Sequence, residues 1–423
     1  REQAMILLRL TARSLWHRRT TALLTLITIG FSVMLFLGVE KVRTETRNSF
    51  ANTLSGADLI VGARSGQIQL LLYSIFRIGD ATSNISWQSY ELVKNHKQVA
   101  WTVPISLGDS HKGYRVLGTT EGYFDHYRYG NRHLLRFEEG RRFEGLYDVV
   151  LGAEVADKLG YKIGSKIVVA HGIGNASFSK HEDKPFRVVG ILERTGTPVD
   201  RTLHVSLEAL EAIHIDWKAG VRIPGKNVSA EEAARLELQP KQITAFLVGM
   251  KSKVATFHLQ RSINNYRKEP MLAILPGVAL QQLWDMVGIA EKALMLVSAI
   301  VVVAGLVGML TVILTSLNER RREMAILRSV GARAWQILLL LALESALLTL
   351  LGVGFGIFLL YGGIALAQPI LESHIGVFIP LTPPSIYQWK LLGLVVVCGT
   401  LVGLIPGYRA YRYSVADGMT IRI

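Results

Sequence analysis

Long apolar runs alternate with mixed stretches along this chain. Residues 20–39, with the sequence TTALLTLITIGFSVMLFLGV, contain no charged side chain, and similar apolar runs recur three times in the last third of the chain. A helix of about 20 apolar residues crosses the roughly 30 Å hydrocarbon core of a bilayer. The pattern therefore predicts four membrane-spanning helices. We place the spanning segments, in chain order, at residues 20–39, 293–317, 335–367 and 386–405, the second as the end of a stretch, 280–317, that begins with a stalk.

The stretch between the first two spans has the pattern of a globular domain. Strand-like and amphipathic helical segments alternate through residues 40–279, and no run there is long and apolar enough to span. About 240 residues suffice for one or two hydrophobic cores, so we expect one large α+β domain. The strands are expected near 57–62, 114–117, 149–151, 166–170, 186–192 and 243–249, and the helices near 87–96, 153–159, 207–213 and 254–266.

Two parts of this stretch have their own character. Turn signals at Gly160, Gly164 and Gly190 separate short strands within residues 148–205, which predicts a compact β-rich insert. Residues 280–292 are amphipathic and lead directly into the second apolar run. We therefore expect the second spanning helix to continue out of the membrane as a stalk.

The distribution of charge predicts the topology. The chain is half apolar, with a formal net charge of +14. Arginines gather before the first span, between the second and third spans, and after the fourth, and cytoplasmic segments carry such an excess. We place residues 1–19, 318–334 and 406–423 in the cytoplasm, and the large domain with residues 368–385 outside it. A cleavable signal peptide is the less favoured alternative for the first span, and this topology removes most of the reason for a nucleic-acid function.

Few residue patterns in the chain suggest chemistry. No GxxxxGK[ST] motif occurs, so we expect no ATP hydrolysis by a P-loop in this chain. No HExxH or cysteine and histidine cluster has metal-ligand spacing, although His171 and His181 flank one loop. The single cysteine, Cys398, lies in an apolar run and leaves no disulfide framework. We predict no catalysis, cofactor or metal for this chain.

The connection between the second and third spans is more informative. Asn318 is a candidate helix cap and Gly331 a candidate left-handed stop, which predicts a short helix between them. Met324, Leu327 and Val330 recur along one apolar edge of that helix. The helix is either an interfacial anchor or a docking site for a cytosolic partner, and the residues alone do not separate the two.

Polar and small residues mark contacts within the membrane. Glu344 falls about two turns inside the third span, where a carboxylate normally faces a partner or a cavity. Glycines spaced four apart allow close approach of neighbouring helices. Two such pairs are Gly352 with Gly356 and Gly399 with Gly403.

Three segments carry a resemblance to a known family. They are ERRREMAILRSVGA in the cytoplasmic connection, LESALLTLLGVGFG in the third span, and VVLGAEVADKLGYKIGSKIVV followed by FRVVGIL in the large domain. Together with the order of spans and domain, they resemble the MacB/LolC/FtsX (type VII) superfamily of ABC permeases. The resemblance implies a periplasmic core domain with an α/β Porter part and a β-rich Sabre part, the latter matching residues 148–205.

The resemblance also implies a function and partners. Two permeases, identical or paralogous, pair with a dimer of cytosolic ATPase subunits that bind ATP and Mg, here expected as separate polypeptides. The motion of the periplasmic domain then serves lipoprotein extraction or export at a bacterial inner membrane, with a periplasmic protein or lipoprotein and membrane lipid as further partners. The residues that match the coupling helix of the family are Glu319, Arg320, Arg321, Glu323, Met324, Leu327, Arg328 and Gly331.

Two other classes of membrane protein fit the sequence less well. A membrane-anchored receptor needs a cytoplasmic output domain, and the cytoplasmic segments predicted here are short. A metal-handling protein needs ligand spacing that the sequence does not contain. Neither class accounts for the cytoplasmic connection.

Overall fold

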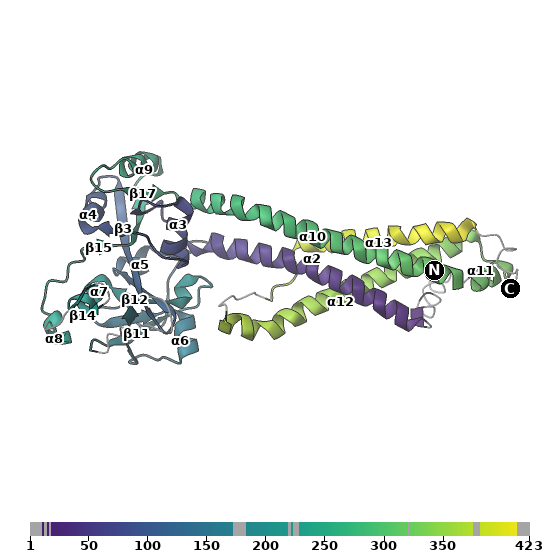
Figure 1. The fold of residues 1–423 in the computed structure, drawn as a ribbon, viewed down its shortest axis with the longest axis horizontal. Helices are drawn as coiled ribbons and strands as arrows, with labels where there is room; N and C mark the ends of the chain where they lie inside the picture. The colour runs from purple at the N-terminus through teal and green to yellow at the C-terminus, as the bar shows by residue number, and fades with distance from the viewer. Residues whose placement is uncertain are drawn as a thin grey trace. The chain divides into compact units, whose positions relative to one another are not determined.

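A computed structural model describes residues 11, 15–16, 18–171, 183–218, 221–222, 228–319, 321–374 and 381–412 of the chain (Figure 1). The chain divides into two compact units. We call residues 1–46 with 288–423 the helical unit, and residues 47–287 the α+β unit.

Four long helices account for most of the helical unit. They are α2 (Arg19–Thr53), α10 (Pro276–Glu319), α12 (Ala334–His374) and α13 (Ile386–Arg412), and the first two extend into the α+β unit. Each contains a window with a mean hydropathy between 2.1 and 2.7 and is long enough to cross a membrane. The prediction of four apolar helices is confirmed. The helices also run beyond the apolar stretches, because the flanking polar segments hold few helix breakers.

One large mixed sheet organises the α+β unit. Its main path runs β17-β1-β16-β3-β4-β12-β8-β11-β7, with β10 paired to β3 and β9 to β11. The strands on the path are β1 (Leu59–Ala63), β3 (Val99–His111), β4 (Tyr114–Thr119), β7 (Phe137–Gly140), β8 (Asp148–Leu151), β11 (Phe186–Leu192), β12 (Thr202–Ser206), β16 (Ala245–Met250) and β17 (Met271–Ile274). The side pairs are β9 (Lys166–Ile167) and β10 (Ala170–His171).

Alternation along the strands separates the two faces of this sheet. In β1, Ile60 packs into one hydrophobic cluster, while Leu59 and Val61 pack into another on the opposite face. The cluster that contains Ile60 also holds Val103 of β3 and Val150 of β8, so it extends along much of the sheet. The opposite face is divided between two separate clusters. Successive strand side chains point to opposite faces, which accounts for this division.

Each of the two clusters on the divided face is covered by a pair of helices. One contains residues of α4 (Trp87–Lys94) and α9 (Thr256–Asn264), and the other contains residues of α6 (Ala153–Leu159) and α7 (Leu207–His214). The hydroxyls of Ser86 and Ser206 accept the backbone N–H groups of Ser89 and Ala209 and so cap α4 and α7. All four helices lie where the amphipathic pattern predicted them.

Residues 148–205 do not form a separate sheet, which corrects our description of them as a compact insert. Their strands β8, β11 and β12 continue the sheet from β4. Val150, Val189 and Leu192 belong to the same core cluster as Ile60. The segment is therefore a lateral extension of one sheet, and its second cluster also takes residues from β4 and α7.

A histidine is buried within this extension. His204 of β12 is completely buried, and its Nδ1 lies 3.3 Å from the carbonyl oxygen of Val150. Its ring lies 5.3 Å from that of Tyr123. Burial, together with the positive charge of Arg77, lowers the pKa of His204 to about 3. The imidazole is therefore neutral in the folded unit at any ordinary pH.

Acid is therefore expected to destabilise the α+β unit through His204. Between about pH 6.5 and pH 3 the unfolded chain binds a proton at this position and the folded unit does not, so the free energy of unfolding falls by about 1.4 kcal/mol per pH unit as the pH drops. Urea unfolding of the full chain in neutral detergent, followed by tryptophan fluorescence, measures this slope. His204→Gln removes the titrating group, and its curve should be flatter by that amount; parallel curves for the two proteins would contradict the assignment.

Candidate functional site

The connection between α10 and α12 contains one short helix, α11 (Arg321–Ser329). Gly331 follows it with a φ of +105°, a left-handed conformation that favours glycine. The Gly331 N–H donates to the Arg328 carbonyl oxygen at 3.1 Å, and the Ala332 N–H donates to that of Leu327 at 3.0 Å. This pair of bonds is a Schellman motif, which satisfies carbonyls that a helix end leaves open. The end of α11 is thus fixed by its own backbone.

The start of α11 differs from our expectation. Asn318 lies inside α10, which continues to Glu319, so it is not the N-cap of a separate helix. Arg320 lies outside the described residues, and the side chains of Glu319, Arg321 and Glu323 are likewise not described. Arg328 is partly buried. In this connection, side chains are therefore described from Met324 onward.

The three residues of the predicted apolar edge of α11 do not share one environment in the structure. Met324 is only 8% exposed and packs in the core of the helical unit with residues such as Ile313 and Ile337. Leu327 and Val330 are 37% and 83% exposed. Met324 therefore holds α11 to its own unit, which corrects its expected role as a contact residue. The accessible apolar group on α11 and its end consists of Ile326, Leu327 and Val330, and we call it the α11 apolar patch.

Glycines bring α12 against α2. A Cβ added at Gly356 would lie 2.7 Å from the carbonyl oxygen of Gly30, and one at Gly352 would lie 2.6 Å from Cγ2 of Ile29. Both separations are too short for a side chain, so the two helices approach closely along this line.

A second line of glycines brings α13 against α12. Gly399 lies against Thr349, and Gly403 lies against Ser345. The two glycine pairs of the sequence thus lie in different contacts, so α12 packs against both α2 and α13. Glu344 lies one residue before Ser345 on α12 and is 5% exposed, so its carboxylate is inside the helical unit.

A polar network in the helical unit has no counterpart in our sequence predictions. Lys41 of α2 is 2% exposed and donates to the carbonyl and hydroxyl oxygens of Thr382, at 3.1 and 3.0 Å. The Tyr361 hydroxyl donates to the same carbonyl at 2.7 Å, and Glu45 lies 3.8 Å from Lys41. In a sequence, a charged pair four residues apart just beyond an apolar run looks like ordinary helix surface. Only the fold shows that this lysine is enclosed and joins α2 to the segment before α13.

Other candidate chemistry is sparse in the described part of the chain. No group of three or more His, Cys, Asp or Glu side chains there is placed to hold a metal ion. The side chain of His171 and the whole of His181 lie outside the described residues.

Family models match both units of the chain. The model of the FtsX-like permease C-terminal region matches residues 295–415, which contain α11, α12 and α13. The model of the MacB-like periplasmic core domain matches residues 21–262, more than half of the chain. The chain belongs to the MacB/FtsX-type family of ABC transporter permeases.

Curated relatives of this permease come from bacteria and an archaeon. The uncharacterized ABC transporter permease YknZ of Bacillus subtilis is 34% identical over 29% of this chain and 30% of its own length. The macrolide export ATP-binding/permease protein MacB of Escherichia coli is 31% identical over 28% of this chain and 17% of its own length. The uncharacterized ABC transporter permease MJ1507 of Methanocaldococcus jannaschii is 25% identical, and the match covers 55% of this chain and 53% of that protein. The chain thus spans about half, or less, of the length of these relatives.

Solved structures similar to this permease are distant from it. The periplasmic region of MacB from Actinobacillus actinomycetemcomitans is 13% identical, with a TM-score of 0.33 over 54% of this chain and 94% of that one. The extracellular domain of the transporter YknZ from Gram-positive bacteria is also 13% identical, with a TM-score of 0.31 over 51% of this chain and 98% of that one.

The glycine contacts of the permease predict that two glycines of α12 differ in how well they tolerate a larger side chain. Gly356→Leu would place a side chain against the Gly30 carbonyl and Val33, and should destabilise the helical unit by about 1–3 kcal/mol. Thermal unfolding in neutral detergent measures the loss.

Gly354→Leu is the matched control, because nothing lies within 4 Å of a Cβ added at that position of the same helix. Equal melting temperatures for the two variants would show that α2 does not pack against Gly356.

Proposed function

We propose that this chain is the permease subunit of an ABC transporter in which a separate cytosolic ATPase drives motion of the α+β unit. The observation that carries the proposal is the α11 apolar patch. Three exposed apolar side chains stand on a short helix whose end is fixed by a Schellman motif and whose inner side is anchored by Met324. A rigid, accessible apolar group of this kind suits docking of a partner protein.

The long helices suit transmission of that motion. α10 is unbroken from Pro276 to Glu319, or about 66 Å at 1.5 Å per residue. Its residues belong to both units, and the same is true of α2. A force applied at α11 would therefore act on helices that continue into the α+β unit. In this mechanism ATP and Mg are bound by the ATPase partner, and this chain does no chemistry.

Location and partners follow from the same proposal. The chain is a multi-pass protein of a bacterial inner membrane, with its α+β unit on the periplasmic side. It pairs with a second copy or a paralogue and with an ATPase dimer. Its cargo is a lipoprotein, or another molecule exported from the periplasmic side. A receptor without transport is the second candidate, and an interfacial role for α11 would favour it.

The docking role of α11 can be tested at one exposed position. Val330→Asp puts a carboxylate into a contact that excludes water, at a cost of several kcal/mol if the ATPase docks there. Association of the purified permease with its ATPase should weaken by at least about tenfold, since about 1.4 kcal/mol corresponds to a factor of ten. Leu327→Asp should act in the same direction.

Ser329→Asp is the matched control, because it adds the same charge at a neighbouring exposed position outside the apolar patch. Folding of each variant is checked by its melting temperature. If Val330→Asp and Ser329→Asp bind the ATPase equally well, α11 is an interfacial anchor and the coupling proposal fails.

The membrane topology is open to a separate test. Reporter fusions after Ala100 and Asn227 should be active only outside the cytoplasm, and fusions after Arg333 and Ile423 only inside it, because the basic segments stay in the cytoplasm. A cytoplasmic signal from either of the first two fusions would contradict the periplasmic assignment.

A further inference from the structure

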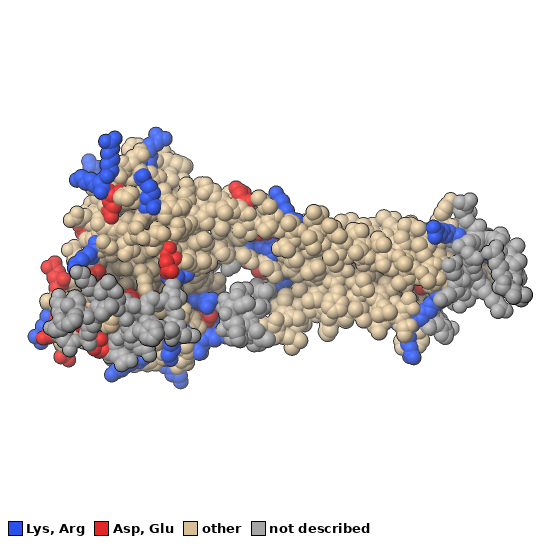
Figure 2. Space-filling model, viewed as in Figure 1, with Lys and Arg blue, Asp and Glu red and all other residues tan. Residues whose placement is uncertain are grey.

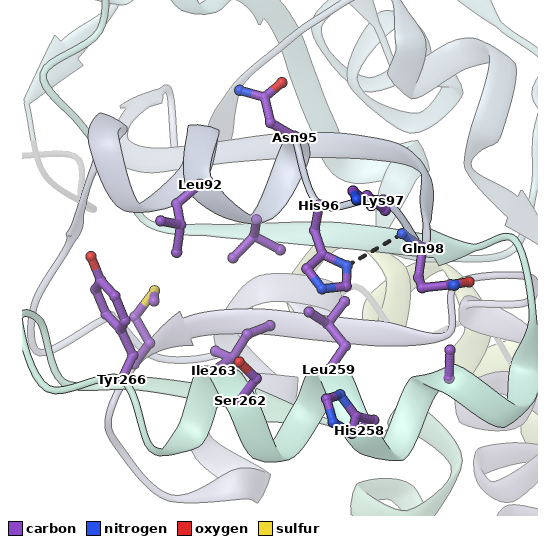
Figure 3. A pocket seen from close by; sticks show the side chains of 13 residues that line it. Leu92, Asn95, His96, Lys97, Gln98, His258, Leu259, Ser262, Ile263 and Tyr266 are labelled. Atoms are coloured by element: carbon purple, nitrogen blue, oxygen red, sulfur yellow. Dashed lines mark hydrogen bonds between the residues drawn. The ribbon is translucent and has the colours of Figure 1, made fainter.

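A groove runs between α4 and α9 on the α+β unit (Figure 3). Val93, Leu259 and Ile263 are buried and form its apolar floor. His96 points into the space between the two helices, and its Nδ1 accepts the backbone N–H of Gln98 at 3.3 Å. In the neutral ring that bond leaves Nε2 as an N–H donor, which suits a ligand with acceptor oxygens.

Large apolar side chains are exposed in and beside this groove. Leu92 of α4 lines the groove and is 53% exposed. Val254, one residue before the groove-lining Ala255, is 87% exposed. Exposed apolar side chains of this size beside an apolar groove are typical of contact surfaces.

The surroundings of the groove are strongly cationic. Seven exposed basic residues lie on the segments that form it, and none has a carboxylate oxygen within ion-pair distance in the described structure: Lys94, Lys97, Lys251, Lys253, Arg261, Arg267 and Lys268. The same segments hold two acidic residues, Glu91 and Glu269, and the carboxylate of Glu269 accepts bonds from the backbone N–H and the hydroxyl of Ser86. Figure 2 shows blue side chains gathered at this end of the unit, with few red ones among them.

Three arginines in another part of the same unit lie beside carboxylates. Arg142 pairs with Asp125 at 3.2 Å, and Arg194 pairs with Asp157 at 2.6 Å. Arg201 also lies 3.3 Å from Glu154. These three arginines lie beside carboxylates, whereas the seven basic residues around the α4–α9 groove do not, so the positive field at the groove is less compensated.

We propose that the α4–α9 groove binds an acidic peptide segment of a partner protein, with apolar side chains entering the groove and carboxylates facing the surrounding lysines and arginines. An acidic segment carries the negative charge that this surface lacks, and its apolar residues would cover Leu92. A groove between two helices, with a narrow apolar floor and hydrogen-bonding groups along it, suits a peptide. The inference rests on the proposed function only in placing this surface outside the cytoplasm, and it requires no ATPase.

The test uses the full chain in a nanodisc of neutral lipid. The probe is a fluorescent peptide of alternating glutamate and leucine blocks, compared with a glutamate and serine peptide and a lysine and leucine peptide. Fluorescence anisotropy should show binding of the first peptide alone, weakening as salt is raised because salt screens the charges. Lys97→Glu/Lys253→Glu/Arg261→Glu should weaken binding of the first peptide at least tenfold, and Leu92→Ser should weaken it severalfold.

A matched triple variant separates local from overall charge. Lys162→Glu/Lys166→Glu/Arg187→Glu makes the same change in net charge at exposed positions elsewhere in the unit. If both triple variants lose the peptide equally, attraction is only to the net charge of the chain and the proposal is wrong. It is equally wrong if short-chain phosphatidylglycerol binds the groove and the peptide does not, since the surface then recognises lipid headgroups. Because no ATPase is present, these outcomes are independent of the α11 test.

Discussion

The α+β unit depends on the pairing of one long strand. β3 runs from Val99 to His111, and its first half pairs with β16 while its second half pairs with β4 and β10. Every other strand on the main path lies to one side of it or the other. Because β3 belongs to both halves of the sheet, the two pairs of covering helices are held on one continuous backbone. The α4–α9 groove and the extension that contains His204 therefore share a single hydrogen-bonded frame.

The sequence predicted elements well where burial is periodic. The helices near 153–159 and 207–213 were identified because their apolar positions repeat with the helical period, and the strand near 186–192 because it is a short and nearly continuous apolar run. β3 was missed because Pro104, Gly108 and Asp109 interrupt its pattern, and long-range pairing overrides weak local preference. The continuity of the sheet across residues 148–205 was missed for the same reason. Strand order depends on contacts between distant segments, and turn signals do not reveal them.

Some features of the candidate site were also predictable from the sequence and others were not. Gly331 was identifiable because only glycine tolerates that backbone conformation well, and the glycine pairs indicated close helix contacts without naming the partner helix. The apolar edge of α11 was also visible, but periodicity does not say whether an apolar side chain meets its own chain or another. Met324 meets its own chain, whereas Val330 does not. The enclosed Lys41 gave no signal, because its burial depends on Thr382, a residue far along the sequence.

The pairing of β1 has a consequence for how the protein is made. Leu59 pairs with Val248, and Ile60 pairs with Ile274, so the neighbours of this strand are the last two strands of the α+β unit to be synthesised. The apolar residues of β1 therefore remain without their strand partners until almost the whole unit has been synthesised. Contacts of such long sequence separation form slowly and leave aggregation-prone edges open. Biogenesis of this permease therefore contains an interval in which β1 must be shielded until the chain reaches α10.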